Sequence, residues 1–224
     1  MASNLTQRVL FAVVAIPLAF GVVWYGGWPL VAVIAAAAVL GARELLGLAQ
    51  RQQVSPLHLT TLISAALVPP LVYLALTSFP ELLGWSWFVA GLWLVAVLSI
   101  ALAQRSPTEH PLTATAVTVL AVSYTAGLPS FLIAIRHLTM PERSWAGTWL
   151  VFLPLVITWV CDTAAMFGGR TFGGPKLWPT VSPGKTWSGS VSGVVAALVT
   201  FLGSAASIRK AMLFDPVRVL RGDA

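Results

Sequence analysis

Charged residues are scarce in this chain. Only 9% of its 224 residues are Asp, Glu, Lys or Arg, and the acidic residues number seven. A soluble domain carries about 25% charged residues, because its surface faces water. The chain also has a single cysteine, Cys161, which excludes a scaffold held together by disulfide bonds. With so few carboxylates, chemistry that needs several acidic groups has few candidate residues.

Apolar residues make up 58% of the chain, which excludes an intrinsically disordered protein. A membrane-spanning helix needs about 20 predominantly apolar residues. Seven apolar runs, of which the second is short, cover residues 9–25, 28–42, 57–77, 82–103, 112–135, 145–161 and 189–208. The sequence therefore predicts an all-α, polytopic integral membrane protein with about seven transmembrane helices. The pair Pro69-Pro70 predicts a kink or break within the third helix.

We expect one membrane domain over residues 1–224. It comprises a six-span part (1–161), a polar loop (162–189), and a last span with a basic tail (190–224). A cytoplasmic N-terminus puts seven Lys and Arg residues inside and six outside, or seven against two without the four of the tail. This bias predicts a multi-pass protein of the cell membrane with the N-terminus and the polar loop in the cytoplasm. The tail breaks the pattern, so either the last run does not fully cross, or this architecture normally continues beyond residue 224.

The net charge of +6 is better explained by topology and lipid contact than by nucleic-acid binding, which needs clustered basic faces. The polar loop holds one acid, Asp162, and three bases, Arg170, Lys176 and Lys185, among six glycines. Spaced cations beside accessible backbone amides favour phosphate binding. A lone carboxylate at the end of a membrane helix is a functional candidate. A loop that only sets the topology would have a similar composition.

Two nucleotide-binding motifs are excluded in this loop. Gly184-Lys185-Thr186 resembles the end of a Walker A loop, but Pro179 stands where that motif needs a glycine, and no hydrophobic strand precedes it. Gly173 and Gly174 do not complete a dinucleotide fingerprint, and the chain lacks the βαβ context for one.

The loop nevertheless resembles that of the phosphatidate cytidylyltransferases, or CDP-diacylglycerol synthases. The family pattern there is D-T-x-A-Y-x-x-G-R-x-F-G, then K-L-x-P, then S-P-K-K-T-x-E-G. The chain matches it without a gap at Asp162-Thr163, Phe167, Gly169-Arg170, Phe172-Gly173, Lys176-Leu177, Pro179, Ser182-Pro183, Lys185-Thr186 and Gly189. The resemblance extends to Arg8, Pro17, Gly26-Gly27, Glu44, Tyr124 and Arg136, and thus to nearly the whole chain.

The resemblance implies that CTP and phosphatidic acid react to give CDP-diacylglycerol and pyrophosphate, a step of phospholipid biosynthesis. Both reactants are highly negative, so Mg²⁺ and basic side chains are needed to neutralise their repulsion. The lipid phosphate must also be positioned for in-line attack on the α-phosphorus of CTP. By this resemblance Asp162 and Lys185 are catalytic, and Asp162 also binds or orients the metal. Substrate-binding residues would be Arg170 and Lys176, which neutralise phosphate charge, and Ser182 and Thr186, which donate hydrogen bonds.

The chain departs from the family at several positions. Gly184 replaces a basic residue, Ser188 a glutamate and Met166 a tyrosine. The family's C-terminal signature, K-R, K-D, P-G-H-G-G and D-R-x-D, which is taken to supply the aspartates of a two-metal site, is absent. We therefore expect a truncated or split chain that acts with a second chain carrying the signature, or as a homo-oligomer. The alternatives are a non-catalytic protein of this lineage that binds acidic lipid and, ranked last because no internal repeat is found, an unrelated transporter.

Overall fold

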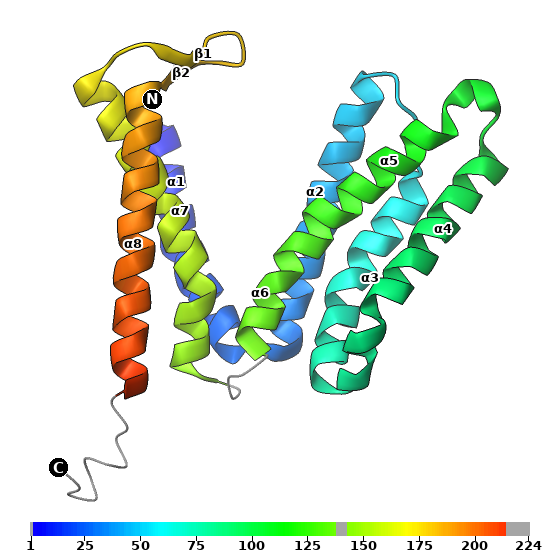
Figure 1. Cartoon of the computed structure of the whole chain (residues 1–224), viewed down its shortest axis with the longest axis horizontal. Coiled ribbons are helices and arrows are strands. Elements are labelled where there is room, and N and C mark those ends of the chain that lie inside the picture. The colour runs from blue at the N-terminus through cyan, green and yellow to red at the C-terminus, as the bar shows by residue number, and fades with distance from the viewer. Residues whose placement is uncertain (1, 138–142, 214–224) are drawn as a thin grey trace, which may run out of the picture. The chain divides into compact units, whose positions relative to one another are not determined.

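The computed structural model describes residues 2–137 and 143–213, and it is built almost entirely of helices (Figure 1). The eight α-helices are α1 (Ala2–Tyr25), α2 (Gly27–Arg51), α3 (His58–Thr77), α4 (Ser86–Gln104), α5 (Pro111–Val122), α6 (Leu128–His137), α7 (Trp145–Phe172) and α8 (Trp187–Leu213). Short helical turns are η1 (Pro80–Trp85), η2 (Pro107–Glu109) and a π-helical turn, η3 (Ser123–Gly127). Two strands, β1 (Lys176–Trp178) and β2 (Ser182–Thr186), form a hairpin.

The predicted all-α membrane fold is confirmed. Within the described residues, six helical segments are long and apolar enough to cross a membrane, and the apolar part of α1, Val13–Tyr25, is a shorter seventh. The predicted fifth span is one of the six, Pro111–His137, but it contains the π-helical turn between α5 and α6. A turn of this kind inserts an extra residue into the helical ladder.

Two predicted boundaries are wrong. α2 continues to Arg51 instead of ending at Ala42, because Arg43, Glu44 and most of the residues after them are good helix formers. The other correction, at the end of α7, concerns the polar loop and is described below.

The pair Pro69-Pro70 does not break the third helix, since α3 runs through both residues. Pro69 is buried, and α3 packs against α2, α5 and α6, so neighbouring helices support the weakened ladder. A kink at this pair stays a prediction.

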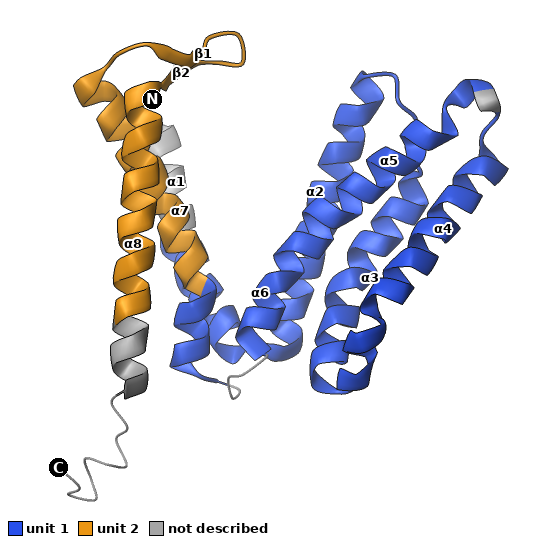
Figure 2. Ribbon diagram, viewed as in Figure 1, with its two compact units in different colours: residues 1–151 blue, residues 152–224 orange. Residues whose placement is uncertain are grey.

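The chain divides into two compact units, residues 1–151 and residues 152–224 (Figure 2). The first unit contains α1 to α6 and the start of α7, and the second contains the rest of α7, the hairpin and α8. The prediction of one membrane domain over residues 1–224 stays a prediction.

Small residues let the helices of the first unit approach closely. Ala38 and Ala42 of α2, Ala65 of α3 and Ala126 of the π-helical turn form one buried cluster. Without large side chains between them, the backbones come close enough for extensive van der Waals contact, which is the main attraction between helices in lipid.

A buried arginine holds the end of α1 to α6. The side chain of Arg136 is fully buried, and its Nε and Nη2 atoms donate hydrogen bonds of 2.8 Å to the carbonyl oxygens of Val23 and Trp24. These carbonyls belong to the last turn of α1, where no further helical amide can reach them. The connection to α2 needs positive φ angles at Gly26 (68°) and Gly27 (54°), and the amide of Gly27 donates to His137 Nε2 at 2.9 Å. Arg136 and His137 therefore fix the turn between α1 and α2.

Replacing Arg136 tests this contact. Arg136→Met keeps an unbranched side chain but removes both donors, and it is expected to lower the free energy of unfolding by at least about 2 kcal/mol, since hydrogen bonds from charged groups are worth about 1.5–3 kcal/mol each. Thermal unfolding in detergent, followed by intrinsic fluorescence, measures the loss. Arg143→Ala is the control: the exposed Arg143 lies 5.1 Å from the Tyr25 ring, a contact worth about 1 kcal/mol or less. Equal losses in the two variants would contradict the assigned role.

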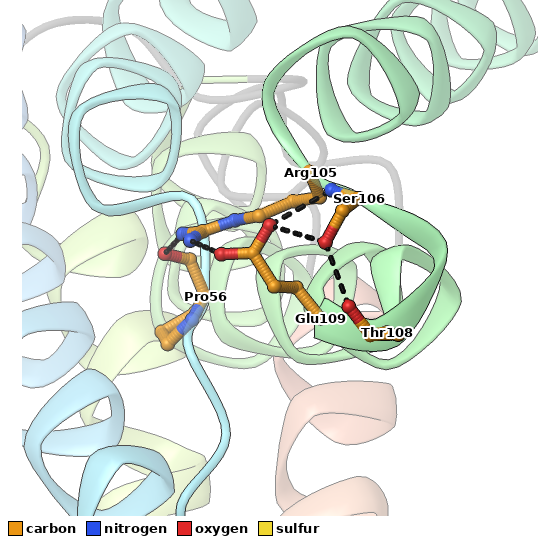
Figure 3. Close-up of polar contacts among 5 residues, drawn as sticks. All are labelled: Pro56, Arg105, Ser106, Thr108 and Glu109. Carbon is orange, nitrogen blue, oxygen red and sulfur yellow. Dashed lines mark hydrogen bonds and ion pairs between the residues drawn. The ribbon is translucent and has the colours of Figure 1, made fainter.

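The link between α4 and α5 is organised by Glu109 (Figure 3). Its Oε2 atom accepts hydrogen bonds from the backbone amide of Ser106 at 2.8 Å and from the Ser106 hydroxyl at 2.9 Å. Arg105 lies 3.7 Å from the same carboxylate and donates to the carbonyl of Pro56 at 3.4 Å. These contacts tie the α4–α5 link to the chain before α3. They lower the pKa of Glu109, first through the Ser106 amide, then through the Ser106 hydroxyl and Arg105.

The lowered pKa predicts how this link responds to pH. Because the Glu109 pKa is lower in the folded than in the unfolded chain, its ionised form stabilises the link above the unfolded pKa, and this stabilisation disappears as the pH falls through the folded pKa. We expect the Ser106 amide to lose protection from hydrogen exchange at acid pH, after correction for the intrinsic rate. In Glu109→Gln the protection is expected to be low and independent of pH. A wild-type pH dependence that persists in Glu109→Gln would assign the effect to another group.

Candidate functional site

Much of the predicted polar loop is helical. α7 continues past Cys161 to Phe172, so residues 162–172 form its last three turns, and only residues 173–186 leave the helix. The prediction that Asp162 lies at a helix end is therefore wrong: it lies ten residues before the end of α7. Gly168 and Gly169 do not stop the helix, because both positions face α8 at close range.

α7 and α8 lie backbone to backbone along a seam of small residues in the second unit. A Cβ atom built on Gly189 of α8 would lie 2.6 Å from the carbonyl oxygen of Ala165, and one built on Gly168 of α7 would lie 2.1 Å from Ser192 Oγ. Farther along, a Cβ on Gly193 would lie 3.1 Å from the carbonyl oxygen of Cys161. Any side chain at these glycines would push the helices apart, and the seam therefore depends on them.

The hairpin begins directly after α7. Gly173 (φ 59°) and Gly174 (φ 102°) adopt the positive φ angles that end the helix and turn the chain. β1 and β2 then pair antiparallel, with Lys176 opposite Thr186 and Trp178 opposite Ser182. The amide of Trp187, the first residue of α8, donates to the carbonyl of Pro175 at 3.1 Å. The hairpin thus starts and finishes at the same end of the α7–α8 pair (Figure 1).

Thr186 caps the N-terminus of α8. Its Oγ1 atom accepts a hydrogen bond of 3.2 Å from the amide of Gly189, three residues later, as in a typical helix N-cap. The side chain is buried, and a Cβ built on Gly169 would lie only 2.9 Å from the hydroxyl oxygen. The role of Thr186 as a donor to substrate stays a prediction. In the structure, its hydroxyl oxygen accepts a hydrogen bond from the first turn of α8.

The structure brings together most of the predicted site residues. Lys176 and Lys185 are exposed on the hairpin, Ser182 is half-buried at the start of β2, and Arg170 is exposed in the last turn of α7. Asp162 is also exposed, but it precedes Arg170 by eight residues, or about 12 Å along the helix axis. The cations therefore gather at the end of α7 and on the hairpin, while the carboxylate lies deeper along α7.

The candidate metal ligand is a single carboxylate. Within the described residues, no group of three or more His, Cys, Asp or Glu side chains lies close enough to hold a metal ion. Mg²⁺, however, often binds through one or two carboxylates together with water and substrate phosphates. Asp162 fits that mode of binding, but it does not by itself form a metal site.

Comparison with known proteins identifies the lineage. The profile of the cytidylyltransferase family matches residues 6–215. The chain belongs to this family. It is 33% identical over 167 residues to the phosphatidate cytidylyltransferase of Rickettsia bellii, an alignment that covers 70% of this chain and 63% of the relative. It is 47% identical over 79 residues to that of Rickettsia felis, or 35% of each chain. No solved structure matches.

The chain spans less than two thirds of the length of these cytidylyltransferase relatives. A third relative, the phosphatidate cytidylyltransferase of Brucella suis, is 33% identical over 136 residues, which cover 54% of this chain and 47% of the relative. The family assignment thus concerns the fold and lineage of the matched residues. What the relatives do is applied to this chain only as a proposal.

Sequence reasoning missed two features of the second unit, the seam and the contact of Ser188. Ser188 figured only as a departure from the family glutamate, yet its hydroxyl donates to the carbonyl of Gly173. The seam had a readable signal: small residues recur four positions apart as Ala165 and Gly169 on α7 and as Gly189 and Gly193 on α8. This spacing is typical of close helix pairs in membranes.

Gly189→Ala tests the seam. The added methyl group would meet the Ala165 carbonyl, which belongs to backbone and cannot move aside, so we expect a loss of about 1–3 kcal/mol in the free energy of unfolding. The matched control is Gly203→Ala on the same helix, where no atom outside the adjoining stretch of α8 lies within 4 Å of the new Cβ and alanine is the better helix former. Thermal unfolding in detergent compares the two. If both variants behave alike, the seam does not limit stability.

Proposed function

We propose that this protein is a phosphatidate cytidylyltransferase, a nucleotidyltransferase that makes CDP-diacylglycerol and pyrophosphate from CTP and phosphatidic acid in phospholipid biosynthesis. The observation that carries the proposal is the gathering of three exposed cations, Arg170, Lys176 and Lys185, where α7 gives way to the hairpin. This segment lies within the range that matches the family profile, and no acidic residue follows Asp162 before residue 215. The positive charge of these three side chains is suited to binding two reactants that both carry phosphate groups.

The reaction needs positioning and charge neutralisation more than covalent catalysis. An oxygen of the lipid phosphate attacks the α-phosphorus of CTP, the bond to the bridging oxygen breaks, and pyrophosphate leaves. We assign Lys185 to the charge that develops in the transition state, and Arg170 and Lys176 to the phosphates of the bound substrates. Ser182, half-buried at the start of β2, is proposed to donate a hydrogen bond to a phosphate oxygen.

Asp162 is the residue that would hold Mg²⁺. When bound, the ion would neutralise phosphate charge and orient the triphosphate. α7 has 28 residues and is about 42 Å long, longer than the hydrocarbon core of about 30 Å. If Trp145 lies at one membrane interface, Asp162 falls about 26 Å along the axis, near the opposite boundary of the core. The carboxylate would then lie at the edge of the hydrocarbon core, about 12 Å before Arg170 along the helix axis.

We place the N-terminus and the hairpin on the cytoplasmic side of the cell membrane. The distribution of basic residues supports this orientation, since seven of them then lie inside and two outside, apart from the tail. CTP would reach the hairpin from the cytoplasm, and phosphatidic acid from the bilayer. A second chain that carries the family's C-terminal signature, or a second copy of this chain, would complete the carboxylate set.

A lipid-binding protein without catalysis is the second candidate, and the single carboxylate of the site favours it. Three exposed cations can bind the phosphate of an acidic lipid, whereas phosphoryl chemistry with Mg²⁺ depends on metal ligands. The two candidates differ in turnover, and both require binding of phosphatidic acid.

Incorporation of labelled CTP into lipid, with phosphatidic acid and Mg²⁺ in mixed micelles, tests the proposal. Lys185→Ala and Asp162→Asn are each expected to lower kcat at least about 100-fold, because each loses an interaction with the developing charge or the metal. Arg51→Ala, which removes an exposed cation from α2 far along the chain, is expected to leave the rate unchanged.

The assay is run on the chain alone and with a polypeptide that carries the C-terminal signature. Turnover in either case supports the enzyme, and restoration only by the added polypeptide supports the split chain. No turnover in both, with retained binding to phosphatidic acid vesicles, would favour the lipid-binding candidate. An unchanged rate in Asp162→Asn would remove Asp162 from the site.

A further inference from the structure

A chain of hydrogen bonds joins the end of α7 to the start of α8. The amide of Gly189 donates to Thr186 Oγ1 at 3.2 Å, Thr186 Oγ1 and Ser188 Oγ lie 3.1 Å apart, and Ser188 Oγ donates to the carbonyl of Gly173. Gly173 is the residue at which the chain leaves α7, and Thr186 is the residue from which it enters α8. The contacts therefore link the two ends of the hairpin.

The donor and the acceptor of each of these three hydrogen bonds follow from the number of protons available. A hydroxyl group has one proton to donate. Ser188 uses its proton on the Gly173 carbonyl, which has none to give, so the Thr186 hydroxyl must donate to Ser188. Thr186 in turn accepts from the Gly189 amide. Both hydroxyl protons are used within the protein, and neither remains for a substrate.

We propose that Ser188 is a positioning residue, which acts through Thr186 to hold Lys185 in place above the α7–α8 pair. Lys185 directly precedes Thr186, whose side chain is buried and anchored over Gly169. Lys176 lies opposite Thr186 in the hairpin, so the same anchor fixes its strand. Ser188 closes the base of the hairpin between Gly173 and Thr186. The catalytic part of this inference rests on the proposed function.

This positioning role is compatible with the short side chain of Ser188, which stands where the family pattern has a glutamate. Ser188 is the second residue of α8 and is half-buried, so its hydroxyl reaches backbone within the protein instead of projecting into the surroundings. Thr186 alone caps α8 but does not reach Gly173. Without the Ser188 hydroxyl, the Thr186 proton and the Gly173 carbonyl would both lose their partners, and the two ends of the hairpin would be joined only by backbone contacts, namely the β1–β2 pairing and the Trp187–Pro175 hydrogen bond.

Hydrogen exchange measured by mass spectrometry over residues 173–189 tests the structural step without any need for turnover. Ser188→Ala is expected to speed exchange of the Trp187 and Gly189 amides about fivefold to tenfold, the size of effect typical for loss of one internal hydrogen bond. Ser188→Thr keeps the hydroxyl and is expected to restore protection. Thr200→Ala is the matched control on α8, since Thr200 donates to the carbonyl of Ala196 in its own helix. Unchanged exchange in Ser188→Ala would overturn the inference.

Kinetics of CTP incorporation test the positioning step. Ser188→Ala is expected to lower kcat about tenfold with little change in the KM for CTP, because a displaced lysine weakens the transition state more than binding. Ser188→Thr is expected to recover kcat. In a Lys185→Ala background, Ser188→Ala is expected to cause no further loss, since its effect runs through Lys185. A further loss in that background would overturn the positioning role.

The two experiments separate this inference from the proposed function. A wild-type protein without turnover, alone and with the added polypeptide, would refute the enzyme and with it the catalytic part of the role. The exchange result would then decide by itself whether Ser188 holds the hairpin.

Discussion

The demand that every backbone amide and carbonyl inside a bilayer find a partner within the protein underlies this structure. Helices satisfy it along their length, so the difficulty is concentrated at their ends, where four groups lack a helical partner. Two of these ends are completed by side chains from outside the helix. Arg136 of α6 donates to the last carbonyls of α1, and Thr186 of the hairpin accepts from the first turn of α8. In both cases the residue that completes the helix end also fixes the adjoining connection, which is the turn from α1 to α2 for Arg136 and the junction of the hairpin with α8 for Thr186.

Small residues determine which helices lie close together. In water, apolar side chains drive association, but in lipid the surroundings are equally apolar, and close backbone contact becomes the main attraction. The alanine cluster of the first unit and the glycine seam of the second serve the same purpose in different ways. The seam allows the closer approach, and it places Gly169 beneath the Thr186 hydroxyl, so the packing of the helices and the capping of α8 depend on each other.

Composition and apolar run length were enough to predict the helices, because spanning length is a property of local sequence. The ends of α2 and α7 were misjudged because charged and glycine residues were read as stops. Arg43 and Glu44 are good helix formers, and Gly168 and Gly169 remain helical because α8 packs against them. The exposed lysines of the site were found from charge and resemblance. The cap by Thr186 is a local contact to Gly189 and was readable in principle, but Thr186 was assigned to substrate instead. The link through Ser188 was not readable, since it depends on Ser188 and Gly173, 15 residues apart in the sequence, meeting in space.

The glycine seam also bears on how the second unit responds to the bilayer around it. Because backbone touches backbone at Gly189 and Gly193, no acyl chain can enter between α7 and α8 along that stretch. Helices that exceed the bilayer thickness accommodate the difference by tilting. Two helices joined in this way tilt together as one body, and the hairpin that connects their ends must follow. A change in membrane thickness would therefore alter the height of the lysines above the lipid, and would leave their spacing intact.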